Sequence, residues 1–183
     1  MDPESKIMKT SNKGFDQCGN ARVIATEDQV IVAADVTNQA NDVRQVCPMI
    51  ETMQSNIEGE LNEFLADAAY FSNENVTAVE AAGLDPFIAT QRLQHHEKIS
   101  DCPRGRAPND LSPKQRMARK LRTKKGRETC RKRKWIVELV FGQIQECRGF
   151  HQFLLRRLKK MLSEWTLQCL AHSQLKAFRA KTA

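Results

Sequence analysis

The hydrophobic pattern of the first third of the chain predicts a polar start and then two strands. Residues 1–18 are mostly polar and show no periodic apolar pattern, so we expect a disordered or frayed start. Residues 21–26 and 29–36 are rich in β-branched side chains, and the turn-like pair Glu27 and Asp28 separates them. This spacing predicts two antiparallel strands, of which the second is well buried.

A helix is predicted after the second strand. Asn41 and Asp42 are candidate N-cap residues, and apolar side chains then recur at spacings of three and four from Val43 to Met53. Such a stripe is typical of a helix with one buried face. We therefore expect this helix to cover the sheet.

A strand–helix–strand unit is predicted next. Residues 61–66 form a short apolar strand that stops at Asp67, and a helix follows from near Ser72 to near Gly83, a favourable C-terminal cap. Residues 86–89 form the next strand. Because crossover connections of this kind join parallel strands, the two strands should be parallel and the sheet is expected to be mixed.

The second half of the chain is expected to hold a loop and two long helices. Residues 90–113 include His95 and His96 and three prolines without periodicity, so they predict a loop or an insertion. Residues 132–146 and 155–178 have the pattern of amphipathic helices. We expect both helices to pack on one face of the sheet.

Length and composition favour one domain with a single core. The chain has 183 residues and is 40% hydrophobic, which suits one soluble domain, here residues 19–183. The longest uninterrupted apolar run, residues 30–34, is far shorter than the roughly 20 residues of a membrane-spanning helix. We therefore expect no membrane partner.

The cysteines indicate a reducing compartment. Six cysteines lie far apart without a C-x-x-C pair, and no signal-like apolar segment opens the chain. This pattern predicts reduced thiols and a cytoplasmic protein. A zinc site that combines cysteines with His95 and His96 is an alternative, although structural zinc sites usually supply closely spaced pairs of ligands.

Positive charge is concentrated in one segment. Residues 1–112 hold 9 Lys and Arg against 18 Asp and Glu, a net charge of −9, while residues 113–134 hold 12 against 1, a net charge of +11. So dense a basic segment must face water or a polyanion, and nucleic acid is its natural partner. A solvated charge run is the alternative interpretation. The candidate DNA-binding residues are Lys124, Lys125, Arg131, Lys132, Arg133 and Lys134.

Two carboxylates are candidate metal ligands. Asp67 stands where an apolar strand ends, a position that faces the ligand-binding crevice of α/β sheets; capping the next helix is the alternative role. Glu138 interrupts the most apolar part of its helix, where an ion pair with Lys134 one turn earlier is the alternative role. Because hard divalent cations take carboxylate oxygens, we expect Asp67 and Glu138 to converge on one cation.

Three segments carry a resemblance to a known family. They are residues 30–43 (VIVAADVTNQANDV), residues 65–71 (LADAAYF) and residues 137–144 (VELVFGQI). In order and spacing they closely resemble bacterial insertion-sequence transposases with a ribonuclease-H-like catalytic domain. The resemblance covers the chain from about residue 9 to about residue 176.

The resemblance implies a fold and a site. The fold would be α/β: an incomplete ribonuclease-H-like fold with a mixed sheet flanked by helices and with the first strand missing. Family members hold two Mg²⁺ (or Mn²⁺) ions with an Asp, a second Asp and a Glu, and Asp67 and Glu138 would be the second and third of these. The first would belong to an upstream, amino-terminal half. Asp35 also ends a strand, but the resemblance places it on the third strand of the sheet.

The chain departs from the family pattern at several positions. Ala69 stands where glycine is usual, and Cys130 stands where tyrosine is common. Lys134 and Gln145 replace the arginine and the lysine expected before and after the Glu. These departures predict weakened phosphate contacts and an altered floor of the active site.

The resemblance implies DNA transposition as the function. The expected reaction is metal-dependent cleavage and transfer of DNA strands at insertion-sequence ends, by a bacterial cytoplasmic protein that acts as a homodimer on DNA. This chain, the carboxy-terminal part of the catalytic domain, is expected to be inactive alone. The alternatives are a non-catalytic DNA-binding remnant of a transposase and a ribonuclease that shares the metal chemistry.

Overall fold

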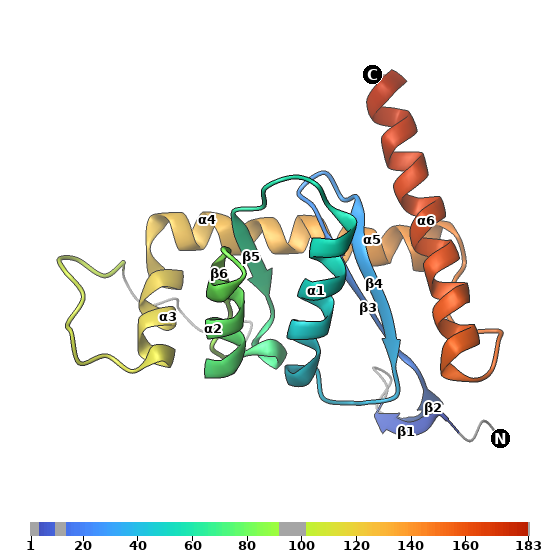
Figure 1. Ribbon diagram of the computed structural model, residues 1–183, viewed down its shortest axis with the longest axis horizontal. Coiled ribbons are helices and arrows are strands. Elements are labelled where there is room, and N and C mark those ends of the chain that lie inside the picture. The colour runs from blue at the N-terminus through green and yellow to red at the C-terminus, as the bar shows by residue number, and fades with distance from the viewer. Residues whose placement is uncertain (1–3, 10–13, 92–101, 183) are drawn as a thin grey trace. The chain divides into compact units, whose positions relative to one another are not determined.

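The protein consists of two compact units. A computed structural model describes residues 4–9, 14–91 and 102–182. Unit 1 comprises residues 1–41, 52–57 and 136–183, and unit 2 comprises residues 42–51 and 58–135. Both units contain strands and helices (Figure 1), and the single domain over residues 19–183 stays a prediction.

Unit 1 begins with a hairpin that the sequence pattern did not predict. Strands β1 (Lys6–Lys9) and β2 (Phe15–Cys18) pair antiparallel, with Met8 opposite Asp16. Met8 is buried, whereas Ile7 is exposed. The expectation of a frayed start is therefore corrected for the described part of residues 1–18. Neither strand has a strong apolar pattern in its sequence, so the pattern alone did not predict them. An isolated two-stranded hairpin is only marginally stable, and its stability depends on contacts with the rest of the folded chain.

A second hairpin follows directly. Strands β3 (Asn20–Ala25) and β4 (Ile31–Thr37) are antiparallel, as predicted, and Ala33 and Val36 of β4 are buried. The turn between them closes with a hydrogen bond from the Thr26 amide to the Val30 carbonyl, at 2.9 Å. The prediction of an antiparallel pair is confirmed.

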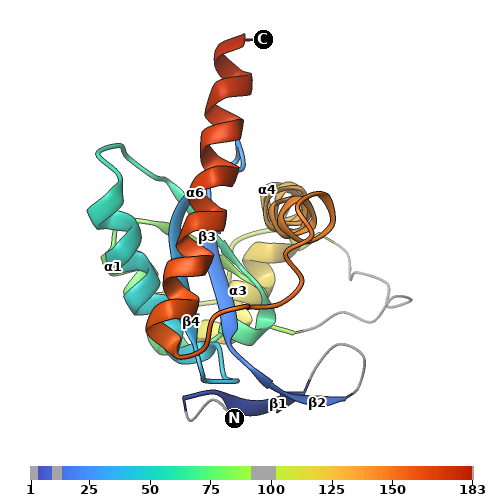
Figure 2. The same ribbon diagram turned by 90° about the vertical axis from the view of Figure 1, so that its right-hand side faces the viewer.

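Two helical segments complete the core of unit 1. The first segment consists of a π-helical turn, η3 (Lys134–Glu138), the short helix α5 (Leu139–Gly142) and a second π-helical turn, η4 (Gln143–Cys147). The second segment is the long helix α6 (Leu158–Thr182). Figure 2 shows α6 running along the β3–β4 hairpin. The core consists of Val36, Val140, Ile144, Met161, Trp165 and Cys169. Both helical segments thus contribute to one core with Val36 of β4, and their predicted packing on one face of a sheet stays a prediction.

A 3-10 turn, η1 (Val43–Gln45), leads into helix α1 (Val46–Asn56). The predicted apolar stripe is confirmed at Val46, Ile50 and Met53, which are all buried. Cys47 is exposed and Met49 is buried in its place. Asp42 occupies the N-cap position of the turn, as predicted, but its side chain makes no capping hydrogen bond.

The strand–helix–strand unit of unit 2 has the predicted order and direction. Strands β5 (Glu63–Ala66) and β6 (Asp85–Ile88) pair parallel, and α2 (Asn73–Ala81) connects them. The Ser72 hydroxyl accepts a hydrogen bond from the Asn75 amide at 3.0 Å and so caps α2. Gly83 has a φ of +79°, a conformation that glycine adopts readily at the end of a helix.

Two short basic helices end unit 2. Residues 102–112 form no helix or strand, and α3 (Pro113–Arg122) then begins with a capping box made by Ser112 and Gln115. Helix α4 (Lys124–Arg133) follows at once. At the corner between them, a Cβ atom on Gly126 would lie 2.2 Å from the Lys120 carbonyl, so only glycine fits there.

The strands of the described residues form three two-stranded sheets, β1–β2, β3–β4 and β5–β6. The parallel and antiparallel pairings expected of a mixed sheet are therefore both present, but they are not joined into one sheet by hydrogen bonds among the described residues. The chain is a mixed α/β protein. The incomplete ribonuclease-H-like fold stays a prediction.

Replacing Ile144 with alanine should lower the free energy of unfolding by about 2–5 kcal/mol, because the side chain is fully buried in the unit 1 core. Leu167→Ala is the matched control: Leu167 is 64% exposed on α6, so its loss should change stability by less than about 0.5 kcal/mol. Urea unfolding followed by circular dichroism measures both. Equal losses would contradict the assignment of Ile144 to the core.

Candidate functional site

Asp67 lies at the carboxyl end of β5, as the sequence predicted. Its Oδ1 accepts a hydrogen bond from the Ala68 amide at 2.6 Å and thereby caps a 3-10 turn, η2 (Ala68–Tyr70). Its Oδ2 forms a salt bridge of 3.0 Å with Nη1 of Arg133 on α4, and 56% of the side chain is exposed. Asp67 is thus a solvent-accessible carboxylate that forms a salt bridge with the Arg133 guanidinium.

Glu138 also lies on a helix, but its surroundings differ from the prediction. The apolar neighbours in sequence suggested a carboxylate that needs a cation, whereas Glu138 is exposed to solvent. It ends the π-helical turn η3, and a π-helical turn holds about one residue more than an α-helical turn. Val140 and Ile144 therefore lie on the buried face of this helix. The expectation that Glu138 lies in an apolar environment and so needs a cation is wrong.

The alternative role of Glu138 is not observed either. Among the described residues, the Glu138 carboxylate forms no salt bridge, and in particular none with Lys134. Glu138 therefore presents an exposed carboxylate. Asp67 belongs to unit 2 and Glu138 to unit 1, and their binding of one shared cation stays a prediction.

The structure contains no preassembled metal cluster in the part of the chain that it describes. No group of three or more His, Cys, Asp or Glu side chains lies close enough together to hold an ion there. His95 and His96, the candidate partners of a cysteine zinc site, lie outside the described residues.

The predicted DNA-binding residues fall into two groups. Lys124, Arg131, Lys132 and Lys134 are exposed on the α4 segment. Arg133 and Lys125 form ion pairs within unit 2: Arg133 binds Asp67, and Lys125 binds the carboxylates of β5 and β6. Part of the charge of these two side chains is therefore balanced before any phosphate binds.

An ionic clamp, formed by Lys120, Lys125, Glu63 and Asp85 around the ring of Phe87, fastens the basic helices to the parallel strands. Lys125 Nζ lies 2.8 Å from Glu63 Oε1 and 3.6 Å from Asp85 Oδ2, and the hydrogen bond to Glu63 is the main cause of its raised pKa. Lys120 forms a salt bridge with Asp85 and donates to the Pro86 carbonyl at 2.6 Å. Its ammonium group lies 4.2 Å from the centroid of Phe87, within cation–π range.

The sequence pattern alone did not reveal this clamp, although two acidic residues at the starts of neighbouring strands indicate that cations lie nearby. In the parallel register Glu63 pairs with Asp85, so the two carboxylates lie side by side at the same edge. Like charges in adjacent positions destabilise a sheet unless cations separate them. Two neighbouring acidic strand starts therefore predict nearby lysines, and Lys120 and Lys125 fill that role.

Cys130, at a position where the resembling family often has tyrosine, is a half-buried thiol on α4. Burial raises the pKa of the thiol, and the positive charge of Arg133 opposes this shift more weakly. Because the thiolate is the form that acts as nucleophile and metal ligand, this direction of shift disfavours both roles for Cys130.

No helix among the described residues is both long enough and apolar enough to span a bilayer.

Comparison with known proteins gives one match. A family model described as a transposase DDE domain matches residues 3–173, which is most of the chain. The comparisons with curated proteins and with solved structures find no match. The matched range includes Asp67, Glu138 and the whole basic segment.

Arg133→Gln should tighten the binding of Mn²⁺ to unit 2 about two- to fivefold, because it removes the cation that competes for the exposed Asp67 carboxylate. Broadening of the Ala68 amide signal during a Mn²⁺ titration followed by NMR reports this affinity. Arg131→Gln removes the same charge from an exposed position on the same helix and is the control. If both variants bind Mn²⁺ equally well, Arg133 does not compete at Asp67.

Proposed function

The chain belongs to the transposase DDE domain family, and on that premise we propose that it is the carboxy-terminal part of a catalytic domain for DNA transposition. The reaction is metal-dependent cleavage and transfer of DNA strands at the ends of an insertion sequence. One observation supports this most directly: Asp67, an exposed carboxylate at the end of a parallel strand, lies beside a basic helix. That combination suits a phosphodiester substrate.

Asp67 and Glu138 are the proposed ligands of Mg²⁺ or Mn²⁺. Both offer hard oxygen donors, and both are exposed, so a cation reaches them without burying charge. A divalent cation bound there would supply the positive charge that activates an attacking oxygen and stabilises a leaving one at phosphorus. The first carboxylate of the site comes from an upstream, amino-terminal half, which also supplies the first strand of a ribonuclease-H-like fold.

Arg133 has a proposed role before DNA and metal bind. Its guanidinium forms a salt bridge with Oδ2 of Asp67, while the Ala68 amide donates to Oδ1. Because an exposed ion pair is worth no more than about 1 kcal/mol, a divalent cation displaces it readily. The released guanidinium is then available to a DNA phosphate.

The basic helices are the proposed DNA-binding surface. Lys124, Arg131, Lys132 and Lys134 neutralise phosphates without reading sequence, since lysine and arginine contacts to the backbone carry no base information. We propose that the full-length protein acts as a homodimer on DNA in the bacterial cytoplasm. The resemblance to insertion-sequence transposases supports both statements.

A second candidate function is a non-catalytic, DNA-binding remnant of a transposase. Lys134 and Gln145, at positions where the family has other basic residues, favour it. In this case the basic helices bind DNA, and the two carboxylates have no catalytic role. Activity after addition of the upstream half separates the two candidates.

The chain should bind duplex DNA without sequence preference, and its affinity should fall steeply with salt, because each neutralised phosphate releases counterions. Lys124→Gln should lower the slope of log K against log salt concentration by about 1, whereas Lys125→Gln should lower it less, since Lys125 is engaged by Glu63 and Asp85. Fluorescence anisotropy over a salt series measures both slopes. An affinity that does not change with salt, or a larger effect of Lys125→Gln, would contradict this surface.

The chain alone should neither cut nor join DNA in Mg²⁺, because two carboxylates leave the site without a bridging ligand. Adding the upstream half should restore strand transfer, measured on a plasmid that carries the insertion-sequence ends. Asp67→Ala or Glu138→Ala should abolish the restored activity. Asp35→Ala is the control and should leave it largely intact.

Two outcomes decide against this assignment. If the isolated chain nicks supercoiled plasmid and Asp35→Ala stops it, then Asp35 is the missing carboxylate. If the completed protein binds insertion-sequence ends but never cleaves them, the non-catalytic function is correct.

A further inference from the structure

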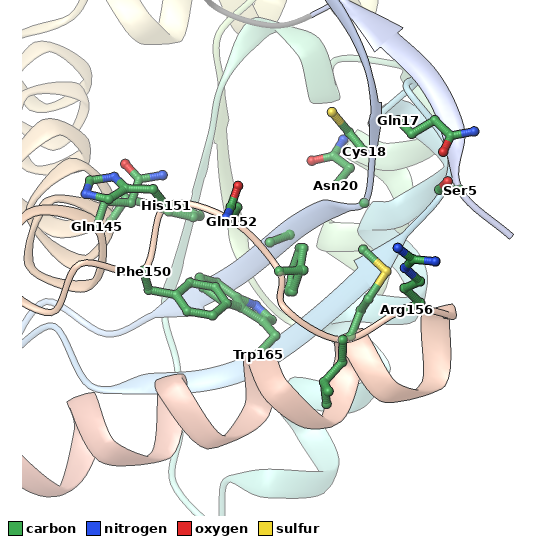
Figure 3. Close-up of a pocket in the computed structure, with 16 residues that line it drawn as sticks. Ser5, Gln17, Cys18, Asn20, Gln145, Phe150, His151, Gln152, Arg156 and Trp165 are labelled. Carbon is green, nitrogen blue, oxygen red and sulfur yellow. The ribbon is translucent and has the colours of Figure 1, made fainter. Parts of the chain in front are cut away.

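Unit 1 contains a pocket of about 700 Å³ that none of the proposed catalytic steps uses. It lies between the β1–β2 hairpin, the start of β3 and the loop that joins η4 to α6 (Figure 3). The pocket is open to solvent, with aromatic and polar side chains around the same space. A ligand that fits it therefore combines flat apolar faces with polar edges.

Aromatic rings form one wall. Trp165 stacks on Phe141 with ring centroids 5.8 Å apart and lies 5.9 Å from Phe150. Phe150 meets Phe153 edge to face at 5.5 Å. The indole of Trp165 is fixed by a hydrogen bond of 3.0 Å from its Nε1 to the Arg22 carbonyl. This wall is thus rigid, and half-buried Phe150 and Phe153 give it open ring surface.

Amides and cations make up much of the remaining lining. Gln145 and Gln152 offer both hydrogen-bond donors and acceptors at the pocket. The Asn20 amide also lines the pocket and donates to the Gln39 carbonyl at 3.4 Å. Arg156 supplies a positive charge there and His151 an imidazole, and the described residues that line the pocket include no carboxylate. The pocket therefore favours an anion that also presents hydrogen-bonding edges.

The loop that carries these groups is held in place before any ligand arrives. The Glu164 carboxylate accepts hydrogen bonds of 3.1 Å from the amides of Leu154 and Leu155. Its charge is therefore engaged by the loop. Gly149 and Arg157 adopt positive φ values, 68° and 71°, at the two ends of the loop. A preformed loop lowers the entropic cost of binding.

We propose that this pocket binds one unpaired nucleotide, with its base against Phe150 and its phosphate at Arg156. Every base has a π-face that stacks on an aromatic ring, and guanidinium groups bind phosphate oxygens well. The proposal rests on the proposed function, because DNA is the expected source of the nucleotide. A free nucleotide has the same chemistry and is the other source.

The two tryptophans of the chain allow a direct test. Trp135 is 70% exposed and lies outside the unit 1 core, so Trp135→Phe leaves Trp165 as the single indole without disturbing that core. In this variant, dAMP and a single-stranded oligonucleotide should change the Trp165 fluorescence saturably, while a fully paired duplex should not. Tighter binding of the oligonucleotide identifies DNA as the source, and tighter binding of dAMP identifies a free nucleotide.

Arginine substitutions test the phosphate contact. Arg156→Gln should weaken dAMP binding about two- to fivefold and leave the binding of adenosine, which lacks a phosphate, unchanged. Arg179→Gln removes the same charge from an exposed position near the end of α6 and should change neither. Unchanged far-UV circular dichroism of both variants shows that they are folded.

Three results would overturn the proposal: no saturable change with either ligand, an equal response to the fully paired duplex, or equal effects of Arg156→Gln and Arg179→Gln. The salt-dependent affinity for duplex is measured separately on the unsubstituted chain. If the chain still binds duplex DNA but the pocket binds no nucleotide, only this inference is wrong. Loss of duplex binding rejects the proposed function instead.

Discussion

The packing of Trp165 on the β3–β4 hairpin is the contact on which unit 1 depends. The indole is buried against Val36, Val140 and Ile144, and its Nε1 group donates to the Arg22 carbonyl. A buried indole N–H needs a partner, so this bond fixes both the depth and the rotation of α6 on the hairpin. The same ring also supports Phe150. Core packing and the wall of the pocket thus share one side chain.

Unit 2 depends on electrostatics to a greater extent. Helices α3 and α4 have little apolar surface, and within them only Met117, Gly126 and Thr129 are buried. Lys120 and Lys125 join these helices to the acidic starts of β5 and β6, and Arg133 joins α4 to the end of β5 at Asp67. The basic segment, which the sequence predicts as a DNA-binding surface, therefore also attaches α3 and α4 to β5 and β6 through ion pairs.

This double role has a consequence for the proposed chemistry. Asp67, the carboxylate proposed above as a metal ligand, is one half of an ion pair with Arg133 of a basic helix. If Asp67 binds a cation and Arg133 binds a phosphate as proposed, each event favours the other, because each releases the partner that the other needs. Lys125 lacks this freedom, since two carboxylates hold it in the clamp.

The sequence by itself determined the local elements and their pairing. The antiparallel hairpin β3–β4, the parallel pair β5–β6, the start of a helix near Ser72 and the position of Asp67 at a strand end follow from local patterns, which neighbouring residues encode. Only the tertiary structure decided which charges are engaged, that Glu138 faces solvent, that β1 pairs with β2 and that a pocket forms beside Trp165. Ion pairs such as Arg133 with Asp67 join residues far apart in the chain, and their geometry depends on how whole elements pack. A π-helical turn likewise shifts a side chain to another face, and an apolar pattern counted at the α-helical period does not reveal it.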